Sequence, residues 1–428
     1  MTSDEVKAPS RRCFLSAAGL AGAAAATLPV TAAQAAMSAP PMSTSAEMMN
    51  QTVPFYGARQ AGIATDMQSS LYFAAFDLTT EKRDDVVALL KRWTNAAARL
   101  CAGLSAQPGE QKADEPGLDS GEALGLKPAG LTITFGFGPD LFTLGGKDRY
   151  GVAAKRPAAL VDVPAFNGDQ MVESQCGGAV CIQACANDTQ VAFHAVRQLA
   201  RLSYGVATMK WAQSGFSPAP VSPGTTRNLM GFKDGTLNPK GKALADAIWV
   251  DEKGDAPWMH QGSYMVARRI RIALEHWDRM KVAFQEQTFG REKISGAPLG
   301  GKHEFDTPNY KAVDTYGNPV IPENCHMRLA APEFNDGAQI LRRSYAYDNG
   351  AVFTAERWPP WRQAVEFDAG LFFQAYQQDP RTGFIKIFDK MSKFDMLNQF
   401  TTHVNNAIFA CPPGAKKGGY IGETLFAA

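Results

Sequence analysis

The chain has almost no excess of charge of either sign. Its 428 residues include 43 basic and 42 acidic side chains, which leaves a net charge of +1. A protein that binds nucleic acid or an anionic membrane surface normally carries a clear basic excess, so we expect neither partner. With 45% hydrophobic residues, the composition instead predicts a large soluble protein with room for two cores.

Long hydrophobic runs are also scarce. The Ala-rich stretch at residues 17–30 is too short for a membrane span, so no stable membrane insertion is expected. It follows Ser-Arg-Arg-Cys-Phe-Leu at residues 10–15 and precedes Ala-Gln-Ala at residues 33–35. This order is typical of a twin-arginine signal peptide with its cleavage site. A disordered Ala-rich tail is the alternative.

We therefore predict a signal peptide over residues 1–36 and a periplasmic or otherwise exported mature protein. The twin-arginine route carries folded proteins, which suits a cofactor loaded before export. Residues 37–52 are rich in Ser, Met, Ala and Pro and are predicted to form a flexible lead-in.

Cysteine is rare and poorly spaced for a metal. One of the seven, Cys13, lies in the predicted signal peptide. Cys181 and Cys185 are four residues apart, but no second spaced pair accompanies them, which argues against an iron–sulfur or zinc site. We expect buried thiols, and a disulfide in an oxidising compartment remains the alternative for the six in the mature chain, which are Cys101, Cys176, Cys181, Cys185, Cys325 and Cys411.

Strand and helix patterns recur in two parts of the chain. Aromatic and apolar runs predict strands at residues 71–78, 131–138, 178–185, 263–272 and 370–376. Helical spacing predicts helices after the first strand and at residues 189–204, 274–289 and 391–402. The strand predicted at 370–376 is expected to correspond to the one at 131–137. The recurrence predicts two related α+β halves, residues 53–215 and 216–428, joined where Ser, Pro and Gly cluster.

Histidine is the scarcest candidate ligand, with six in the chain. No pair of histidines with a nearby carboxylate has the local spacing of a non-haem iron site. Most of the six are expected on helices or charged loops, in packing or surface roles. His326 stands apart because it leads from a loop into Met-Arg-Leu-Ala at residues 327–330.

Three short motifs occur in one order. Gly-Phe-Lys-Asp-Gly-Thr-Leu-Asn-Pro occupies residues 231–239, and its glycines allow tight backbone turns around Asp234. His-Met-Arg-Leu-Ala follows at 326–330 and Leu-Arg-Arg-Ser-Tyr at 341–345. Together they resemble the dye-decolourising peroxidases, and within these the exported deferrochelatase/peroxidase (EfeB-type) branch. The resemblance runs from about residue 53 to 413.

The resemblance implies the fold and the cofactor. Each half is expected to be ferredoxin-like, as in dimeric α+β barrels, and haem b is expected mostly in the C-terminal half. His326 matches the axial iron ligand of the family. Asp234 matches the general base that moves the peroxide proton, and Arg342, the first arginine of its pair, matches the catalytic cation. Arg343 is expected to point the other way along an extended chain.

Further haem contacts follow from the same match. Gly235, Thr236 and Leu237 are expected close to the macrocycle, and Leu371 and Phe373 on an apolar wall. Ala331, Pro332 and Glu333 stand where related sequences read Asn-Pro-Arg. They are expected beside the haem, but the acidic Glu333 cannot replace a propionate contact of that arginine.

An axial histidine usually donates its second ring N–H to a carboxylate. Asp395 is the candidate for that partner here. Asp336 and Asp389 are alternatives, and so is an exposed helix position for Asp395.

The function implied is a haem peroxidase that reduces hydrogen peroxide and oxidises small organic donors such as phenols and dyes. The EfeB-type resemblance also implies a role in iron acquisition by release of iron from haem, with iron-uptake components as partners, and a homodimer or larger assembly. The alternative is a haem carrier or sensor without turnover, which would need His326 but neither Asp234 nor Arg342.

Overall fold

The computed structural model describes residues 45–218, 224–355 and 363–427. The predicted signal peptide at residues 1–36 lies outside these ranges, as does the first part of the lead-in. Within them, no helix combines the length and the apolar character needed to cross a membrane.

The described end of the lead-in is anchored to the fold. Helix α1 (Ser45–Asn50) is followed by a segment whose backbone pairs with the residues before the second strand. The carbonyls of Met49 and Gln51 each accept from a backbone N–H, of Ala129 and Gly130, at 2.8 Å. Composition could not show these long-range backbone bonds, and the flexible lead-in over residues 37–52 stays a prediction.

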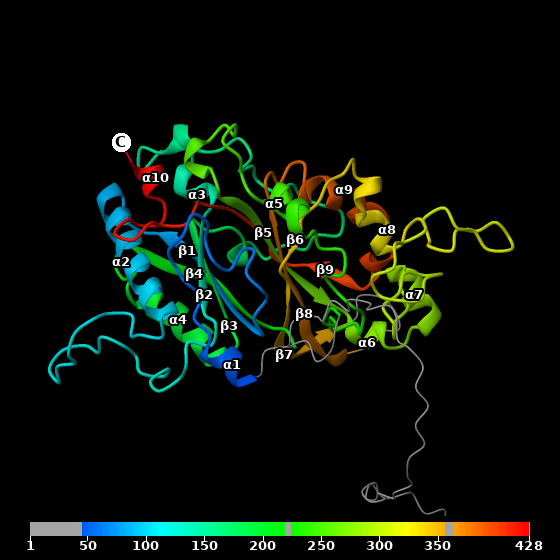
Figure 1. Cartoon of the computed structure of the whole chain (residues 1–428), viewed down its shortest axis with the longest axis horizontal. Helices are drawn as coiled ribbons and strands as arrows, with labels where there is room; N and C mark the ends of the chain where they lie inside the picture. The colour runs from blue at the N-terminus through cyan, green and yellow to red at the C-terminus, as the bar shows by residue number, and fades with distance from the viewer. Residues whose placement is uncertain (1–44, 219–223, 356–362, 428) are drawn as a thin grey trace, which may run out of the picture. The chain divides into compact units, whose positions relative to one another are not determined.

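The N-terminal half is one β-sheet covered by two helices. Its order along the chain is β1 (Ser70–Leu78), α2 (Arg83–Cys101), β2 (Thr132–Phe137), β3 (Val180–Ala186), α4 (Thr189–Arg201) and β4 (Ala207–Phe216). Its strands lie in the order β4-β1-β3-β2. Figure 1 shows α2 and α4 together on these strands, and Trp93 of α2 packs on Phe76 and Phe135 of the sheet.

The C-terminal half repeats this topology. Its main strands are β5 (Ser263–Ile272), β7 (Tyr345–Ala355), β8 (Gln363–Gln377) and β10 (Ala407–Cys411), with α9 (Phe384–Phe394) between the last two. They lie in the order β10-β5-β8-β7, which is again fourth, first, third, second. The two halves therefore have the same ferredoxin-like connection, as the recurrent sequence pattern predicted.

Shorter elements surround these two sheets. They are α3 (Pro139–Phe142), α5 (Gly241–Ile248), α6 (Leu274–Trp277), α7 (Val282–Phe289), α8 (His326–Ala330), β6 (Leu341–Arg342), β9 (Thr401–His403) and α10 (Glu423–Phe426). Helices α6 to α9 lie at the end of the sheet away from α2 and α4 (Figure 1).

The two sheets close into a barrel. Strand β4 meets β7 and β2 meets β10, while β5 and β8 pair within the C-terminal half. Aromatic side chains fill the barrel, with the ring of Phe73 5.3 Å from that of Phe372 and 6.0 Å from that of Phe409. Because side chains alternate along a strand, the residues between these inner ones face outward, under the helices.

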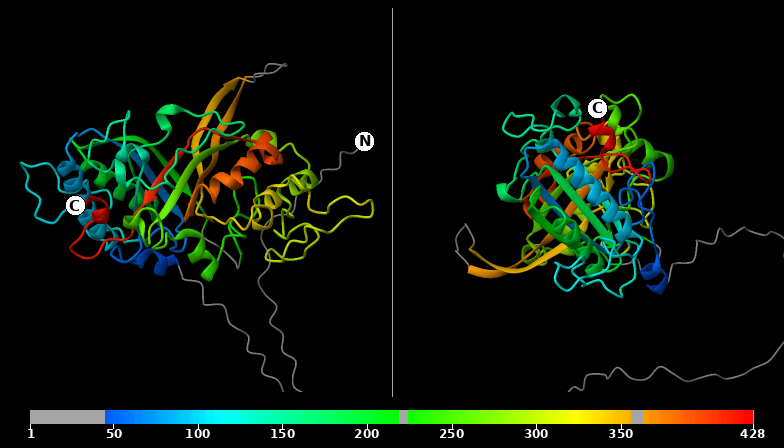
Figure 2. Two further views of the ribbon diagram at one scale, coloured as in Figure 1. Left: turned by 90° about the horizontal axis from the view of Figure 1, so that it is seen from above. Right: turned by 90° about the vertical axis from the view of Figure 1, so that its left-hand side faces the viewer.

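Beyond the barrel, β7 and β8 continue as a two-stranded ribbon. Figure 2 shows this ribbon extending away from the other strands. The pairing shifts register between Asp348 and Ala351, and Gly350 there has a φ of 89°. A side chain rarely adopts this angle, so glycine suits the bend.

Several predicted elements need correction. Strand β5 matches its prediction residue for residue, but the strand predicted at 370–376 belongs to β8, which takes the place of β3 rather than β2. The equivalent of β2 is β7, which the sequence analysis missed. The Asp-Asn-Gly sequence at residues 348–350 is typical of a turn, and it interrupts the strand pattern.

Two predicted helices also differ. The stretch 274–289 forms two short helices, α6 and α7, rather than one. The helix predicted at 391–402 is α9, which begins earlier, at Phe384, and ends at Phe394. It ends there because Asp395 accepts a bond from the backbone N–H of Leu397 and begins a 3₁₀ turn. Residues 401–403 then pair with β5 as β9.

The six cysteines of the described residues are free thiols. Cys181 and Cys411 both approach Gly136, whose missing side chain leaves room for their sulfurs. They belong to β3 and β10, on either side of β2, so their Cα atoms are about two strand spacings, or about 10 Å, apart. A disulfide needs Cα atoms within about 7 Å, so the barrel holds this pair apart.

Candidate active site

A cavity of about 1640 Å³, including the space at its mouth, lies in the C-terminal half. Its floor is the outer face of the sheet, where Ile270 and Ile272 of β5 lie beside Leu371 and Phe373 of β8. Phe384 and Phe388 of α9 contribute to another wall. The lining is mainly apolar with a few charged groups, as expected for a site that binds a large flat organic molecule.

His326 enters this cavity from the start of α8. Its Nδ1 lies 2.7 Å from Oδ2 of Asp395, and that carboxylate is buried while the imidazole is 32% exposed. The other carboxylate oxygen of Asp395 accepts from the backbone N–H of Leu397 at 2.9 Å. This arrangement fixes the ring and leaves its Nε2 as the nitrogen that could bind a metal.

The sequence left three candidates for the carboxylate partner of His326. The structure selects Asp395, which lies between α9 and the following 3₁₀ turn. Asp336 instead pairs with Lys386, and Asp389 pairs with Lys393.

Asp234 lies in the glycine-rich turn, which also lines the cavity. Gly231 and Gly235 both have a φ of 86°, a conformation that strongly favours glycine. The carboxylate of Asp234 accepts from Nη1 of Arg342 at 3.3 Å, and both side chains are a little over a quarter exposed. A carboxylate and a fixed cation are thus brought together from residues more than a hundred positions apart.

Asn238 fastens the turn to the strand that carries Arg342. Its side-chain amide donates to the carbonyl of Arg342 at 2.8 Å and accepts from the backbone N–H of Arg342 at 3.1 Å. Arg342 lies opposite Ala375 of β8, on the outer face. Arg343 points the other way and donates to the carbonyls of Thr65 and Asp66 and to Gln68, as the sequence analysis predicted.

Glu304 forms a clamp at the base of the turn. Its Oε1 accepts from the backbone N–H and the hydroxyl of Thr225, at 3.0 and 2.6 Å, and from the hydroxyl of Thr236 at 3.1 Å. Its Oε2 lies 3.4 Å from Nζ of Lys233. Burial alone would raise the pKa of Glu304, but these hydrogen bonds and Lys233 lower it overall. The charged carboxylate therefore holds both ends of the turn together.

Most of the predicted haem contacts line the cavity. They are Asp234, Gly235, Thr236, Leu237, His326, Ala331, Pro332, Arg342, Leu371 and Phe373. Glu333 is the exception, since it is in the short 3₁₀ turn beside the cavity and is not one of the described residues that line it.

Three lining or supporting residues were missed by the sequence analysis. Glu304 and Arg291 carry no motif of their own, and only the folded chain shows where they lie. His403 also lines the cavity from β9. Burial, and then the neighbouring Arg268, lowers the pKa of His403 well below its ordinary value, which keeps this imidazole neutral.

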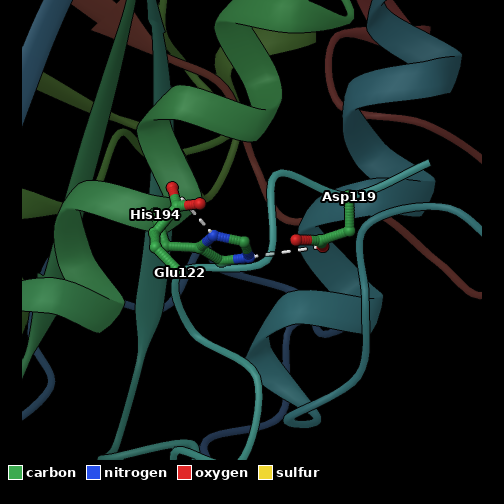
Figure 3. A group of neighbouring side chains, drawn as sticks. All are labelled: Asp119, Glu122 and His194. Carbon is green, nitrogen blue, oxygen red and sulfur yellow. Dashed lines mark ion pairs between the residues drawn. The ribbon is translucent and has the colours of Figure 1, made fainter. Parts of the chain in front are cut away.

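A second histidine cluster lies in the N-terminal half, distant in sequence from the cavity motifs. Figure 3 shows the imidazole of His194 between Asp119 and Glu122. Its Nε2 lies 3.4 Å from a carboxylate oxygen of Asp119, and its Nδ1 lies 3.1 Å from one of Glu122. Arg197 lies 3.2 Å from the same glutamate. The two carboxylates face opposite ring nitrogens, and the guanidinium of Arg197 already neutralises Glu122. The cluster therefore does not suit a metal ion. It instead attaches the loop before β2 to α4.

The residues at the main cavity fit a haem. Its apolar walls suit the macrocycle, His326 offers one nitrogen held by a buried carboxylate, and Asp234 with Arg342 supplies a proton acceptor beside a cation. This donor set matches what the three motifs implied.

Comparisons with known proteins identify the family. The family described as Dyp-type peroxidase, N-terminal, matches residues 60–217, and the family described as Dyp-type peroxidase, C-terminal, matches residues 225–416. The chain is 36% identical over 447 residues to a dye-decolorizing peroxidase of Thermobifida fusca, with 98% of each covered. It is 35% identical over 432 residues to a deferrochelatase of Escherichia coli, covering 98% of this chain and 97% of the relative.

Solved structures show the same fold. The crystal structure of a DyP-type peroxidase from Streptomyces coelicolor superposes with a TM-score of 0.81 at 35% identity, over 90% of this chain and all of the other. The predicted fold class, two ferredoxin-like α+β halves, is confirmed. The chain therefore belongs to the Dyp-type peroxidase family and is a haem peroxidase.

Proposed function

We propose that the chain activates hydrogen peroxide in this cavity, with His326 holding the haem iron and Asp234 and Arg342 acting on the peroxide. The observation that carries the proposal is the Asp234–Arg342 pair, 3.3 Å apart, in the same cavity as the His326–Asp395 pair. A haem carrier would need only the second pair.

Asp395 keeps His326 in position. By accepting the Nδ1–H, it fixes the tautomer with the lone pair on Nε2 and makes that nitrogen more electron-rich. Bound haem supplies a redox-active iron and a conjugated macrocycle, which together accept the two oxidising equivalents of peroxide.

Asp234 moves the proton and Arg342 stabilises the charge. The carboxylate takes a proton from one peroxide oxygen and returns it to the other, so that the O–O bond breaks with release of water. The guanidinium lies beside the carboxylate and offsets the negative charge that develops on the leaving oxygen. Organic donors such as phenols and dyes then return two electrons, one at a time.

Iron release from haem is a second candidate, supported by the deferrochelatase relatives at 34–35% identity. The site favours peroxidase chemistry, because removal of iron has no need for the Asp234–Arg342 pair. The two activities are distinguished by their products. Metal-free porphyrin formed in step with iron loss would support iron release, and its absence during turnover would support peroxidase activity only. A place among iron-uptake components rests on the same relatives.

Export and assembly are also proposals. The twin-arginine pattern at residues 10–15 supports export of the folded protein to the periplasm. A homodimer or larger assembly rests on the family resemblance, and light scattering of the purified protein would test it.

Replacing His326 by Ala should give protein with little bound haem, because the iron loses its nitrogen ligand and Asp395 loses its partner. The measurement is the haem content and the Soret band of the purified variant. His303→Ala, in an exposed loop, is the control and should retain both. A variant at position 326 with normal haem content and activity would show that another residue binds the iron.

Arg342→Leu should slow the reaction with peroxide by about 10²- to 10³-fold, as for loss of one fixed charge-stabilising donor. Asp234→Asn removes the base but keeps its shape, with an expected loss of roughly 10²- to 10⁴-fold. The measurement is stopped-flow change of the Soret band after mixing with peroxide, on variants matched for haem content. Unchanged rates in both would remove the assignment of this pair.

Glu304→Gln should loosen the turn that carries Asp234, and we expect a loss of about tenfold in the peroxide rate with haem content retained. Since the pKa of Glu304 is lowered in the folded protein, the clamp is complete above the ordinary carboxyl pKa and is lost as the pH falls through the lowered value. The wild-type advantage over the variant should therefore shrink in acid. Glu323→Gln, whose side chain is 77% exposed, is the control, and an equal rate loss in both would contradict the clamp.

Changing both Arg11 and Arg12 to Lys should leave unprocessed protein in the cytoplasm, because the twin-arginine route reads the arginine pair. The cytoplasmic protein should still bind haem and reduce peroxide. Fractionation and the mass of the mature N-terminus are the measurements. Normal export of the double variant would contradict the proposed route.

A further inference from the structure

The charged groups that line the cavity pair off with one exception. Asp234 pairs with Arg342, Asp395 with His326, and Lys233 with the buried carboxylate of Glu304. Arg291 also lines the cavity, and no carboxylate in the described ranges forms an ion pair with it within 4 Å. Arg291 is therefore a lining cation with no direct carboxylate partner among the described residues.

Arg291 is held firmly from one side. It follows α7, and only 6% of the residue is exposed. Its Nη1 donates to the backbone carbonyls of Gly296 and Glu304, at 2.7 and 3.0 Å. Its Nη2 is buried and finds no hydrogen-bond acceptor among the residues that the structure describes. One edge of the guanidinium is thus fixed, while donors remain unused.

A buried guanidinium with an unpaired N–H group is unfavourable unless an anion lies beside it. Burial is the main cause that lowers the pKa of Arg291, and the neighbouring Arg342 acts in the same direction; Tyr310 and the carboxylate of Glu304 offset only part of this. A charged group with unsatisfied donors costs free energy when it is taken out of water. An anionic group on the ligand of this cavity would offset that cost, because arginine forms strong paired hydrogen bonds with carboxylates.

We propose that Arg291 is the binding residue for a carboxylate of the haem, and that it sets the orientation of the macrocycle in the cavity. The proposal rests on haem occupying this cavity as described above. Haem carries two carboxylates on one edge of an otherwise apolar ring, so one unpaired cation at the cavity wall distinguishes that edge from the others. The same cation is a poor partner for an uncharged porphyrin.

The test compares two ligands that differ only in this charge. Full-length protein produced without haem is titrated with haem and with haem dimethyl ester, whose carboxylates are esterified. Wild type should bind haem more tightly than the ester. Arg291→Gln, which keeps an N–H donor but loses the charge, should bind haem about 10- to 100-fold more weakly, with ester affinity changed less than about twofold. Arg291→Lys should restore part of the preference.

Arg271→Leu is the matched control. Arg271 lies on β5 between two cavity-lining residues, but pairs with Glu366 at 3.1 Å; it should keep the wild-type preference for haem over the ester. Equal weakening of both ligands in Arg291→Gln would show a packing role and overturn the proposal. If Arg291→Gln kept the wild-type preference for haem over the ester, the proposal would also be overturned. If wild type showed no Soret band with either ligand, the assignment of the haem site itself would have failed.

Discussion

Strand β8 is the constraint on which both the barrel and the site depend. On one side it pairs with β5 over eight residue pairs, from Tyr264 with Gln377 to Arg271 with Gly370. On the other side it pairs with β7 and then with the short β6. The first pairing closes the barrel and builds the cavity floor, and the last places Arg342 at the cavity. Alternation along the one strand places Phe372 in the barrel core and Leu371 and Phe373 at the cavity.

Five of the eight main strands in the described residues were predicted from the sequence, and β4, β7 and β10 were not. Strand β5 is a continuous run of apolar and aromatic residues bounded by turn signals, so its limits could be predicted. Strand β7 was missed because its bend carries the Asp-Asn-Gly sequence of a turn, although the chain only shifts register there. The helix predicted through Asp395 failed for a related reason: the same side chain that supports His326 also caps the next turn, and periodicity does not reveal a cap within an apolar pattern.

At the site, too, some residues could be predicted from the sequence and others could not. His326, Asp234 and Arg342 lie in motifs, and a resemblance could identify them. Asp395 bonds His326 across 69 residues, and Glu304 holds the turn of Asp234 through Thr236, across 68 residues. Arg291 lines the same cavity and is fixed by the carbonyls of Gly296 and Glu304. Such contacts depend on the folded chain, and a lone carboxylate or arginine in a loop carries no sign of its partner. Sequence therefore predicted the motif residues of the cavity better than the residues that hold them in place, and Arg291 had no motif to identify it.

The repeated topology has a consequence for how the chain tolerates change. In the N-terminal copy, the 19-residue helix α2 lies on the sheet and its Trp93 fills the space between helix and strands. In the C-terminal copy, the corresponding segment breaks into the short helices α6 and α7, and the outer face of the sheet is left for the cavity. One copy of the fold thus serves as a packed scaffold and the other as a container. Substitutions in the N-terminal copy would lower the amount of folded protein, whereas substitutions on the cavity-lining face of the C-terminal copy would change what the cavity binds and how it reacts.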